Sequence, residues 1–254
     1  MNKDIVIHVS DLTKYYSETL AVDHINFEVE KGEVFGFLGP NGAGKTTTIR
    51  ILTGLSRPTD GNASIFGLDI NSQIVQIKKH IGVVPEISNL YDELSAMDNL
   101  IFMAQLYGVP ALLAQKKAQD LLKIFRLYQR KDSPFRTFSR GMKRALTVAC
   151  ALIHNPKVLF LDEPTVGLDV VAARSLRNLI SNLRQQGITI FLTTHYLEEA
   201  DLLCDRVAIL VKGRILTIDT PLSLKAKTDK KSLEEAFMKI TGLEPEVLVI
   251  EKGK

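Results

Sequence analysis

Hydrophobic and polar residues alternate along the first thirty positions of the chain. A period of two is typical of β-strands that bury one face and leave the other in water. The pattern therefore predicts two antiparallel strands within residues 5–30. Their apolar positions are Ile5, Ile7 and Val9, then Ile25, Phe27 and Val29.

The next apolar stretch is continuous rather than alternating. Residues 34–38 read VFGFL, which predicts a strand buried on both faces, and a helix is expected over residues 46–55, with its stop at Gly54. A strand and turn are expected over residues 61–70, a polar helix over 71–80 and a strand over 81–84.

Helical periodicity then dominates for about seventy residues, and the strand pattern resumes after it. Helices are expected over residues 97–108, 110–127 and 140–154. Buried strands are expected over 158–161 and 188–192, on either side of a helix that contains Leu176 and Leu183 and is closed by Gly187. Ser232 and Glu235 predict a capping box for a last short helix.

The elements divide the chain into four predicted parts. Strands that alternate with helices favour a largely parallel sheet, with ligands at the carboxyl ends of its strands. The parts are a β subdomain with the first part of the core (1–85), an inserted helical subdomain (86–155), the second part of the core (156–220) and a tail (221–254).

Composition narrows the class of protein only modestly. The chain has 254 residues, 45% of them hydrophobic and 24% charged, which is ordinary for a globular protein. A net charge of +3, with scattered Lys and Arg, gives no electrostatic reason to expect nucleic acid binding. The N-terminus has no secretory signal pattern and no stretch of 18 apolar residues occurs, so a cytosolic location is expected. Cys150 and Cys204 lack the spacing of a metal or redox site, so buried free thiols are expected.

Residues 39–47, GPNGAGKTT, follow the predicted buried strand directly and open the next helix. Glycines allow the backbone N–H groups of such a loop to turn towards phosphate oxygens, and the helix N-terminus adds partial positive charge. Lys45 adds a full positive charge, and the Thr46 hydroxyl can bind a Mg²⁺ that bridges the outer phosphates. We call residues 39–47 the phosphate loop, and it predicts nucleoside triphosphate binding.

Polar residues also follow the two later buried strands. Asp162 has the position of a carboxylate that holds Mg²⁺, and Glu163 beside it can orient or deprotonate an attacking water. His195 could donate to the outermost phosphate, although a lone histidine at this position is more often a hydrogen-bonded loop residue. These residues and the phosphate loop should converge at one edge of the sheet.

Two further features have a plain and a functional interpretation. Ser139 is a natural N-cap, and Gly141 would let a phosphate approach the first N–H groups of its helix, but an ordinary capped helix would show the same pattern. Tyr16 could stack on a purine base, and a tyrosine at a sheet edge is an equally good explanation.

Together these stretches resemble the ATPase subunit of an ABC transporter over nearly the whole chain. The motifs of that family match in order: Tyr16 as the aromatic loop, GPNGAGKTT as Walker A, VVPE as the Q-loop, FSRGMKR as the signature, VLFLDEP as Walker B, GLD (167–169) as the D-loop and His195 as the switch histidine. The resemblance implies an α/β P-loop fold, with a RecA-like core, an N-terminal antiparallel β subdomain and an inserted helical subdomain.

The resemblance also implies a set of functional residues and two partners. Two copies would form a head-to-tail dimer, most simply a homodimer, around two Mg²⁺-ATP, and a separate transmembrane permease subunit would complete the transporter. The implied catalytic residues are Glu163, His195 and Glu86, and the implied Mg²⁺ ligands are Thr46, Glu86 and Asp162. ATP would be bound by Tyr16, Gly39, Pro40, Asn41, Gly42, Ala43, Gly44, Lys45, Thr46 and Thr47, and from the other copy by Ser139, Arg140, Gly141, Met142 and Asp169.

Two departures from the family pattern point to one of its branches. The signature reads SRGMK instead of the common SGGQ, with Arg140 and Met142 as substitutions, and Glu86 stands where glutamine is usual. Both changes resemble the type-2 exporter branch, whose ATPases work on the cytoplasmic face of the cell membrane. The alternative is a non-transport ABC ATPase of the iron–sulfur assembly, translation or DNA-repair type. A single ATPase domain without a visible coiled-coil or zinc insertion disfavours the last two types.

Overall fold

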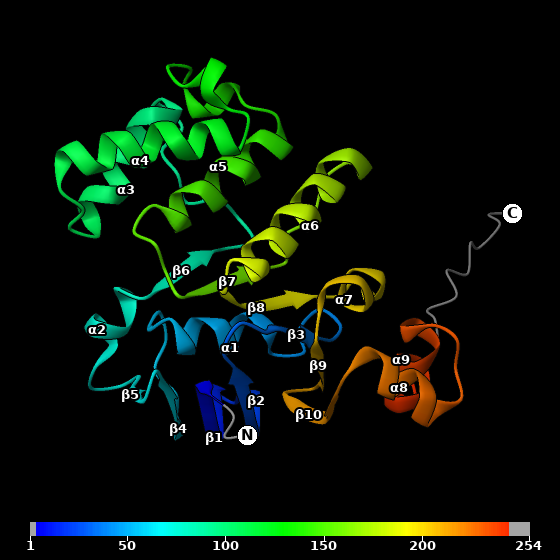
Figure 1. Ribbon diagram of the computed structural model, residues 1–254. Helices are drawn as coiled ribbons and strands as arrows, with labels where there is room; N and C mark the ends of the chain where they lie inside the picture. Colours follow the sequence, from blue (N-terminus) through cyan, green and yellow to red (C-terminus); the bar gives the residue numbers. More distant parts are fainter. Residues whose placement is uncertain (1–3, 244–254) are drawn as a thin grey trace, which may run out of the picture.

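Two β-sheets and the helices that pack on them make up the fold in the computed structural model, which describes residues 4–243 (Figure 1). The predicted N-terminal segment before residue 4 and the end of the predicted tail after residue 243 lie outside the described residues. In chain order the elements are β1 (Ile5–Tyr16), β2 (Thr19–Glu30), β3 (Val34–Leu38), α1 (Lys45–Leu52), β4 (Asp60–Ile65), β5 (Leu68–Asp69), α2 (Ile74–Lys78), β6 (Ile81–Val84), α3 (Ala96–Leu106), α4 (Ala111–Ile124), the 3₁₀ turns η1 (Tyr128–Arg130) and η2 (Phe135–Thr137), α5 (Arg140–Leu152), β7 (Val158–Asp162), α6 (Val170–Gln185), β8 (Thr189–Thr194), α7 (Leu197–Leu203), β9 (Arg206–Val211), β10 (Arg214–Asp219), α8 (Pro221–Thr228) and α9 (Leu233–Thr241).

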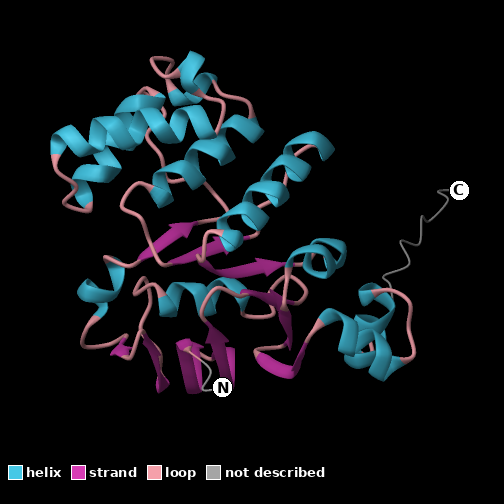
Figure 2. Ribbon diagram, viewed as in Figure 1, coloured by secondary structure: helices cyan, strands magenta, loops and turns pink. Residues whose placement is uncertain are grey.

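The larger sheet has the strand order β10-β9-β3-β8-β7-β6 and is parallel except for β10. Every residue of β3, β7 and β8 is buried, because both faces of these strands are covered. Phe35 and Phe37 pack towards the smaller sheet, while Val34 and Leu38 belong to the core under the helices. Figure 2 shows the larger sheet between the helices and the smaller sheet. The predicted α/β fold with a largely parallel sheet is confirmed.

The smaller sheet is antiparallel, with the order β2-β1-β4-β5. Val9 pairs with Phe27 in the β1–β2 hairpin, as the alternation of the sequence predicts. The Phe27 ring stacks on Phe35 of the larger sheet with 5.6 Å between ring centroids. Helix α1 lies between the two sheets and adds Ile49 and Ile51 to this shared core.

Helices α3, α4 and α5 form a helical lobe with its own core, on the far side of the larger sheet from the smaller one (Figure 1). Helix α4 ends at Ile124, three residues before the predicted end at Leu127. Arg126 takes a left-handed backbone conformation with φ 57°, and the Leu127 N–H donates to the Leu122 carbonyl at 2.7 Å. This geometry is a Schellman motif, which closes a helix.

The chain after β8 contains elements that the sequence pattern did not predict, namely α7, β9, β10 and α8. The predicted last helix is present as α9, and Ser232 caps it by accepting from the Glu235 N–H at 3.1 Å. The reciprocal half of the predicted capping box is wrong, because the Glu235 carboxylate accepts from the Lys231 N–H at 3.2 Å instead. Within residues 4–243, no helix is both long and apolar enough to cross a membrane.

Both cysteines are buried free thiols, as predicted. Cys150 lies in the core of the helical lobe, and Cys204 lies in the core between the larger sheet and helices α6, α7 and α9. A Cβ atom on Gly36 of β3 would lie 2.6 Å from the Cys204 sulfur, so the glycine makes room for this thiol. Burial raises the pKa of both thiols far above the usual range.

Arg144 of α5 joins the helical lobe to the larger sheet. Its guanidinium donates to the carbonyl oxygens of Pro85 at 2.5 Å, Pro164 at 2.8 Å, Asp162 at 2.9 Å and Glu86 at 3.4 Å. Arg144 is 8% exposed, and burial lowers its pKa to about 10, so the side chain is still a cation at neutral pH. One side chain thus holds α5 against the ends of β6 and β7.

We expect Arg144→Met to lower the free energy of unfolding by about 3 kcal/mol, because buried carbonyl groups lose their donor. Urea titration at pH 7 measures this loss. Arg136→Met is the matched control, since the Arg136–Glu93 pair is 62% and 81% exposed and such a pair contributes less than about 1 kcal/mol. Equal losses in both variants would contradict the role of Arg144.

Candidate functional site

The phosphate loop leaves β3 at Leu38 and enters α1 at Lys45, and its backbone requires glycine at two positions. Gly44, the N-cap of α1, has φ 105°, and a Cβ atom there would lie 2.4 Å from the Ala21 carbonyl oxygen. A Cβ atom on Gly39 would lie 2.2 Å from the Leu210 carbonyl oxygen. The loop can therefore fold tightly against β2 and β9, and the first N–H groups of α1 are left to bind an anion.

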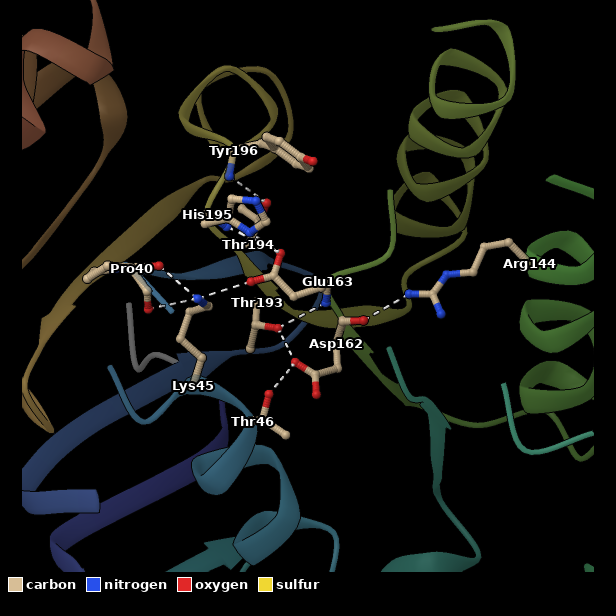
Figure 3. Close-up of polar contacts among 11 residues, drawn as sticks. Pro40, Lys45, Thr46, Arg144, Asp162, Glu163, Thr193, Thr194, His195 and Tyr196 are labelled. Carbon is tan, nitrogen blue, oxygen red and sulfur yellow. Dashed lines mark hydrogen bonds and ion pairs between the residues drawn. The ribbon is translucent and has the colours of Figure 1, made fainter. Parts of the chain in front are cut away.

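Lys45 lies under this loop and is almost fully buried. Its ammonium donates to the carbonyl oxygens of Gly39 at 2.7 Å and Pro40 at 3.2 Å, and it pairs with Glu163 Oε1 at 3.0 Å (Figure 3). The Lys45 and Glu163 side chains are 6% and 7% exposed. A phosphate entering the loop would therefore meet a cation that a carboxylate already neutralises.

Asp162 ends β7 and is held by two hydroxyl groups. Asp162 Oδ1 accepts from Thr46 at 3.2 Å and from Thr193, its neighbour on β8, at 2.5 Å. Thr193 Oγ1 also accepts from the Glu163 N–H at 3.1 Å. Sequence reasoning gave Thr193 no role, because a threonine inside a buried strand carries no motif.

Glu163 faces His195, which follows β8. Glu163 Oε2 accepts from the His195 ring nitrogen Nδ1 at 2.9 Å and from the His195 N–H at 3.3 Å. Glu163 has a left-handed backbone with φ 46°, a conformation that costs a residue other than glycine about 1–3 kcal/mol. At Glu163 this conformation directs the side chain towards Lys45 and His195.

A cavity of about 560 Å³ opens beside these groups, within the size range of small-ligand sites. The convergence that the sequence predicted is confirmed for the phosphate loop, Glu163 and His195. The lining residues are Ala21, Asn41, Gly42, Ala43, Gly44, Lys45, Thr46, Thr47, Glu86, Glu163, Val166, His195 and Tyr196.

Tyr16 does not line this cavity. It ends β1, is 43% exposed, and its ring lies 5.0 Å from the Lys14 ammonium. The position on a sheet edge is wrong in the sense of an edge strand, because β1 lies between β2 and β4, and base stacking stays a prediction.

The predicted signature residues line a different hollow, between α5, α6 and the end of α4. Ser139 caps α5 by accepting from the Met142 N–H at 3.3 Å, and Asp169 caps α6 by accepting from the Ala172 N–H at 2.8 Å. A Cβ atom on Gly141 would lie 2.9 Å from the Ala172 Cβ, so close packing of α5 on α6 is one reason for this glycine. Ser139, Gly141, Met142 and Asp169 lie together, apart from the phosphate loop. Arg140 is exposed, and its guanidinium lies 3.9 Å from a Cβ built on Gly167.

The donor set at Asp162 and Thr46 fits a Mg²⁺ ion. Mg²⁺ prefers oxygen ligands, takes one or two of them from the protein and completes its shell with water and substrate phosphates. The Thr46 hydroxyl and the Asp162 carboxylate already lie 3.2 Å apart beside the loop. Among residues 4–243 no cluster of three or more His, Cys, Asp or Glu could hold a metal alone, so the phosphates would have to supply further ligands.

Comparison with known proteins places this architecture in a family. Residues 22–166, more than half of the chain, match the ABC transporter family. The chain is 41% identical over 219 residues to the Nod factor export ATP-binding protein I of Ralstonia nicotianae, covering 86% of this chain and 68% of that protein. It is 35% identical over 242 residues to the "Probable multidrug ABC transporter ATP-binding protein YbhF" of Escherichia coli, covering 93% of this chain and 42% of that protein.

A solved structure of an ATP-binding subunit of an ABC transporter has the same fold. It superposes with a TM-score of 0.84 at 32% identity, covering 93% of this chain and 99% of that one. The family match, the relatives and the fold agree with the resemblance found in the sequence. The chain therefore belongs to the ABC transporter family, as an ATP-binding subunit with ATPase activity.

Proposed function

We propose that two copies of this chain hydrolyse ATP at shared sites and drive export through a separate membrane subunit. The observation that carries this proposal is the separation of the two anion-binding ends within one chain. The phosphate loop lines one hollow, and the N-terminus of α5 with Ser139 lines another. A single copy therefore offers each end only half of the surroundings of a nucleotide.

A head-to-tail pair would bring these halves together. The phosphate loop of one copy would hold ATP, and Ser139, Arg140, Gly141 and Met142 of the other copy would approach its outer phosphate with the N-terminus of α5. Asp169, which lies beside Ser139 in the second hollow, would reach the same site. The exposed apolar side chains of Val170 and Val171, which are 80% and 76% exposed, lie next to it and could be covered in such a pair.

Hydrolysis would use the contacts around Glu163. An outer phosphate bound to Lys45 would compete with the Lys45–Glu163 pair and free the carboxylate. Glu163 would then accept a proton from the water that attacks the outer phosphorus, while the bond from this phosphorus to the bridging oxygen of ADP breaks. His195 would hold Glu163 Oε2 in place and donate towards the phosphate.

Thr46, Asp162 and Glu86 would hold Mg²⁺, which supplies charge neutralisation at the outer phosphates when bound. Two residues keep Asp162 in position. Thr193 donates to its side-chain carboxylate, and Arg144 of α5 donates to its backbone carbonyl oxygen. Tyr16 would stack on the base, for which its exposed ring is available.

The relatives favour export as the process that is driven. One is named for Nod factor export and the other as a multidrug transporter. We infer a peripheral location on the cytoplasmic face of the membrane, where the chain would contact its permease. The segment between β6 and α3 offers Ile87 and Tyr91, which are 83% and 52% exposed, as apolar contacts for that partner. No observation favours a non-transport ABC ATPase.

Replacing the proposed base should trap the closed pair. We expect Glu163→Gln to bind ATP, to lower the hydrolysis rate at least about 100-fold and to shift from monomer to dimer with ATP. Light scattering with and without ATP measures the shift. Glu163→Gln combined with Ser139→Arg is the control, since a bulky cation at the cap should block the second copy. A dimer that forms equally in the control would contradict the shared site.

Glu86 provides a separate prediction about the metal. It lines the phosphate cavity, and a carboxylate binds Mg²⁺ more tightly than an amide does. Glu86→Gln should therefore raise the Mg²⁺ concentration for half-maximal hydrolysis by about 3-fold or more. An unchanged Mg²⁺ dependence would remove Glu86 from the proposed ligands. The control is Glu93→Gln, because the Glu93 side chain is exposed and lies outside the cavity.

The contact with the membrane subunit can be tested at Ile87. The acidic residues Asp92 and Glu93 of the same segment are less suitable, because they pair with Lys143 and Arg136 of the same chain, and reversing their charge would also break these pairs. Ile87 is therefore the better position for a substitution that tests the contact. We expect Ile87→Glu to lower the fraction of chain bound to membranes of its own cells by about 10-fold, with basal ATPase unchanged. Val75→Glu, at an exposed residue of α2, is the control. Equal membrane binding by both variants would contradict a contact between Ile87 and the membrane subunit.

A further inference from the structure

Helix α7 follows His195 directly and buries a carboxyl group. Glu199 is 2% exposed, whereas Glu198 beside it points into solvent. Neither carboxyl oxygen of Glu199 has a hydrogen-bond partner among the described residues. Carboxyl groups are rarely buried unless they are paired, because desolvation of the charged form is costly.

The groups around Glu199 come from the segments that carry the reaction. The hydroxyls of Thr194 and Thr165 lie beside its carboxyl group, without completing a hydrogen bond to it. The charges of Arg177 of α6 and of Glu163 act on Glu199, and the charge of Glu199 in turn acts on Arg144 and Cys204. Burial raises the pKa of Glu199, and the negative charge of Glu163 adds to this, while both hydroxyls and Arg177 lower it.

Folding alone gives no reason for an acid at this position. A buried polar group without a partner destabilises the folded state, and an apolar residue of similar volume would be neutral or favourable there. Local features that cost stability occur mainly at functional sites, where another gain offsets them.

The two hydroxyls show what Glu199 could connect. Thr165 lies two residues after Glu163 and is 8% exposed, and Thr194 immediately precedes His195 and is fully buried. Thr194 Oγ1 accepts from the Tyr196 N–H at 3.0 Å, which leaves its own O–H to act as a donor. A carboxylic acid between the two hydroxyls can accept from one and donate to the other, and so tie the backbone after Glu163 to the backbone before His195.

We propose that Glu199, as the protonated acid, is a positioning residue that bridges Thr165 and Thr194 and thereby fixes the Glu163–His195 pair. The bridge forms when both hydroxyls come within hydrogen-bonding range of the carboxyl group. Glu199 touches neither nucleotide nor water in this role, and it acts through the 2.9 Å contact of Glu163 with His195. The inference rests on the proposed function of Glu163 as the base.

The first experiment compares Glu199→Gln with Glu199→Leu in the full chain. Glutamine keeps one donor and one acceptor, so its kcat should stay within about 2-fold of the unchanged protein. Leucine removes both, and kcat should fall about 10-fold or more while the KM for ATP changes less than about 2-fold, because positioning is lost and binding is not. Glu198→Leu, on the exposed side of α7, is the matched control and should keep kcat.

Thermal unfolding separates this role from a structural one. If Glu199→Leu loses activity, its Tm should equal or exceed that of the unchanged protein, because an unpartnered buried carboxyl has been removed. A parallel fall in Tm and kcat would mean that Glu199 only supports the fold, and would overturn the proposal. Equal losses of kcat in Glu199→Gln and Glu199→Leu would also overturn it, since the charged form would then be the one required.

Stability against pH tests the protonated state without any activity measurement. A pKa raised above the ordinary value of 4.5 adds stability that is complete below the unfolded value and is lost as pH rises through the folded value. The Tm of the unchanged protein relative to Glu199→Gln should therefore fall as pH rises from about 4.5. A difference that does not change with pH would overturn the protonated bridge.

The outcomes also distinguish this inference from the proposed function. If Glu163→Gln hydrolyses ATP normally, the base assignment fails and the inference fails with it. If Glu163→Gln is inactive while Glu199→Leu keeps kcat, only the inference fails. A double variant with Thr165→Val gives an additional check, because two members of one bridge should lose no more together than the larger single loss.

Discussion

The pairing of β7 with β8 is the constraint on which the site depends. In this parallel register Asp162 lies opposite Thr193, and their side chains hydrogen bond at 2.5 Å. Since β8 also pairs with β3, the same register brings the phosphate loop to that edge of the sheet. A slip of one residue would turn Asp162 into the core and its apolar neighbours into the site. The fully buried strands prevent such a slip, because every side chain has a fixed place in one of two cores.

Much of this arrangement could be predicted from the sequence, where local pattern and tertiary packing agree. The phosphate loop carries its own chemistry, and strand ends in a parallel sheet share one edge, so the approach of Glu163 to Lys45 and His195 followed from order alone. Arg144 and Thr193 could not be found in this way, because their roles depend on carbonyl and carboxylate groups far along the chain. The division into four parts and the roles of individual site residues stay predictions.

The site also shows how reaction chemistry and folding stability oppose each other in one small region. Glu163 has a left-handed backbone, Arg144 is a desolvated cation, and Glu199 is a buried carboxyl group without a hydrogen-bond partner among the described residues. The stability that offsets these costs comes from packing elsewhere, which includes the contacts between the sheets of the rings of Phe27, Phe35, Phe37, Phe160 and Phe191. The helix that carries Glu199 illustrates the limit of pattern reasoning, since nothing in LEEADLL indicates which of its two glutamates turns inward.

The two buried thiols can report separately on the opening of two parts of the molecule. Cys150 belongs to the core of the helical lobe, and Cys204 to the core between the larger sheet and helices α6, α7 and α9. Both thiols have a raised pKa, which keeps them protonated and unreactive while they are buried. Each thiol meets an alkylating reagent only when its own core opens. The alkylation rates of the two sulfurs would therefore measure how often each of the two cores opens. The unaltered chain can be used, and no probe has to be added.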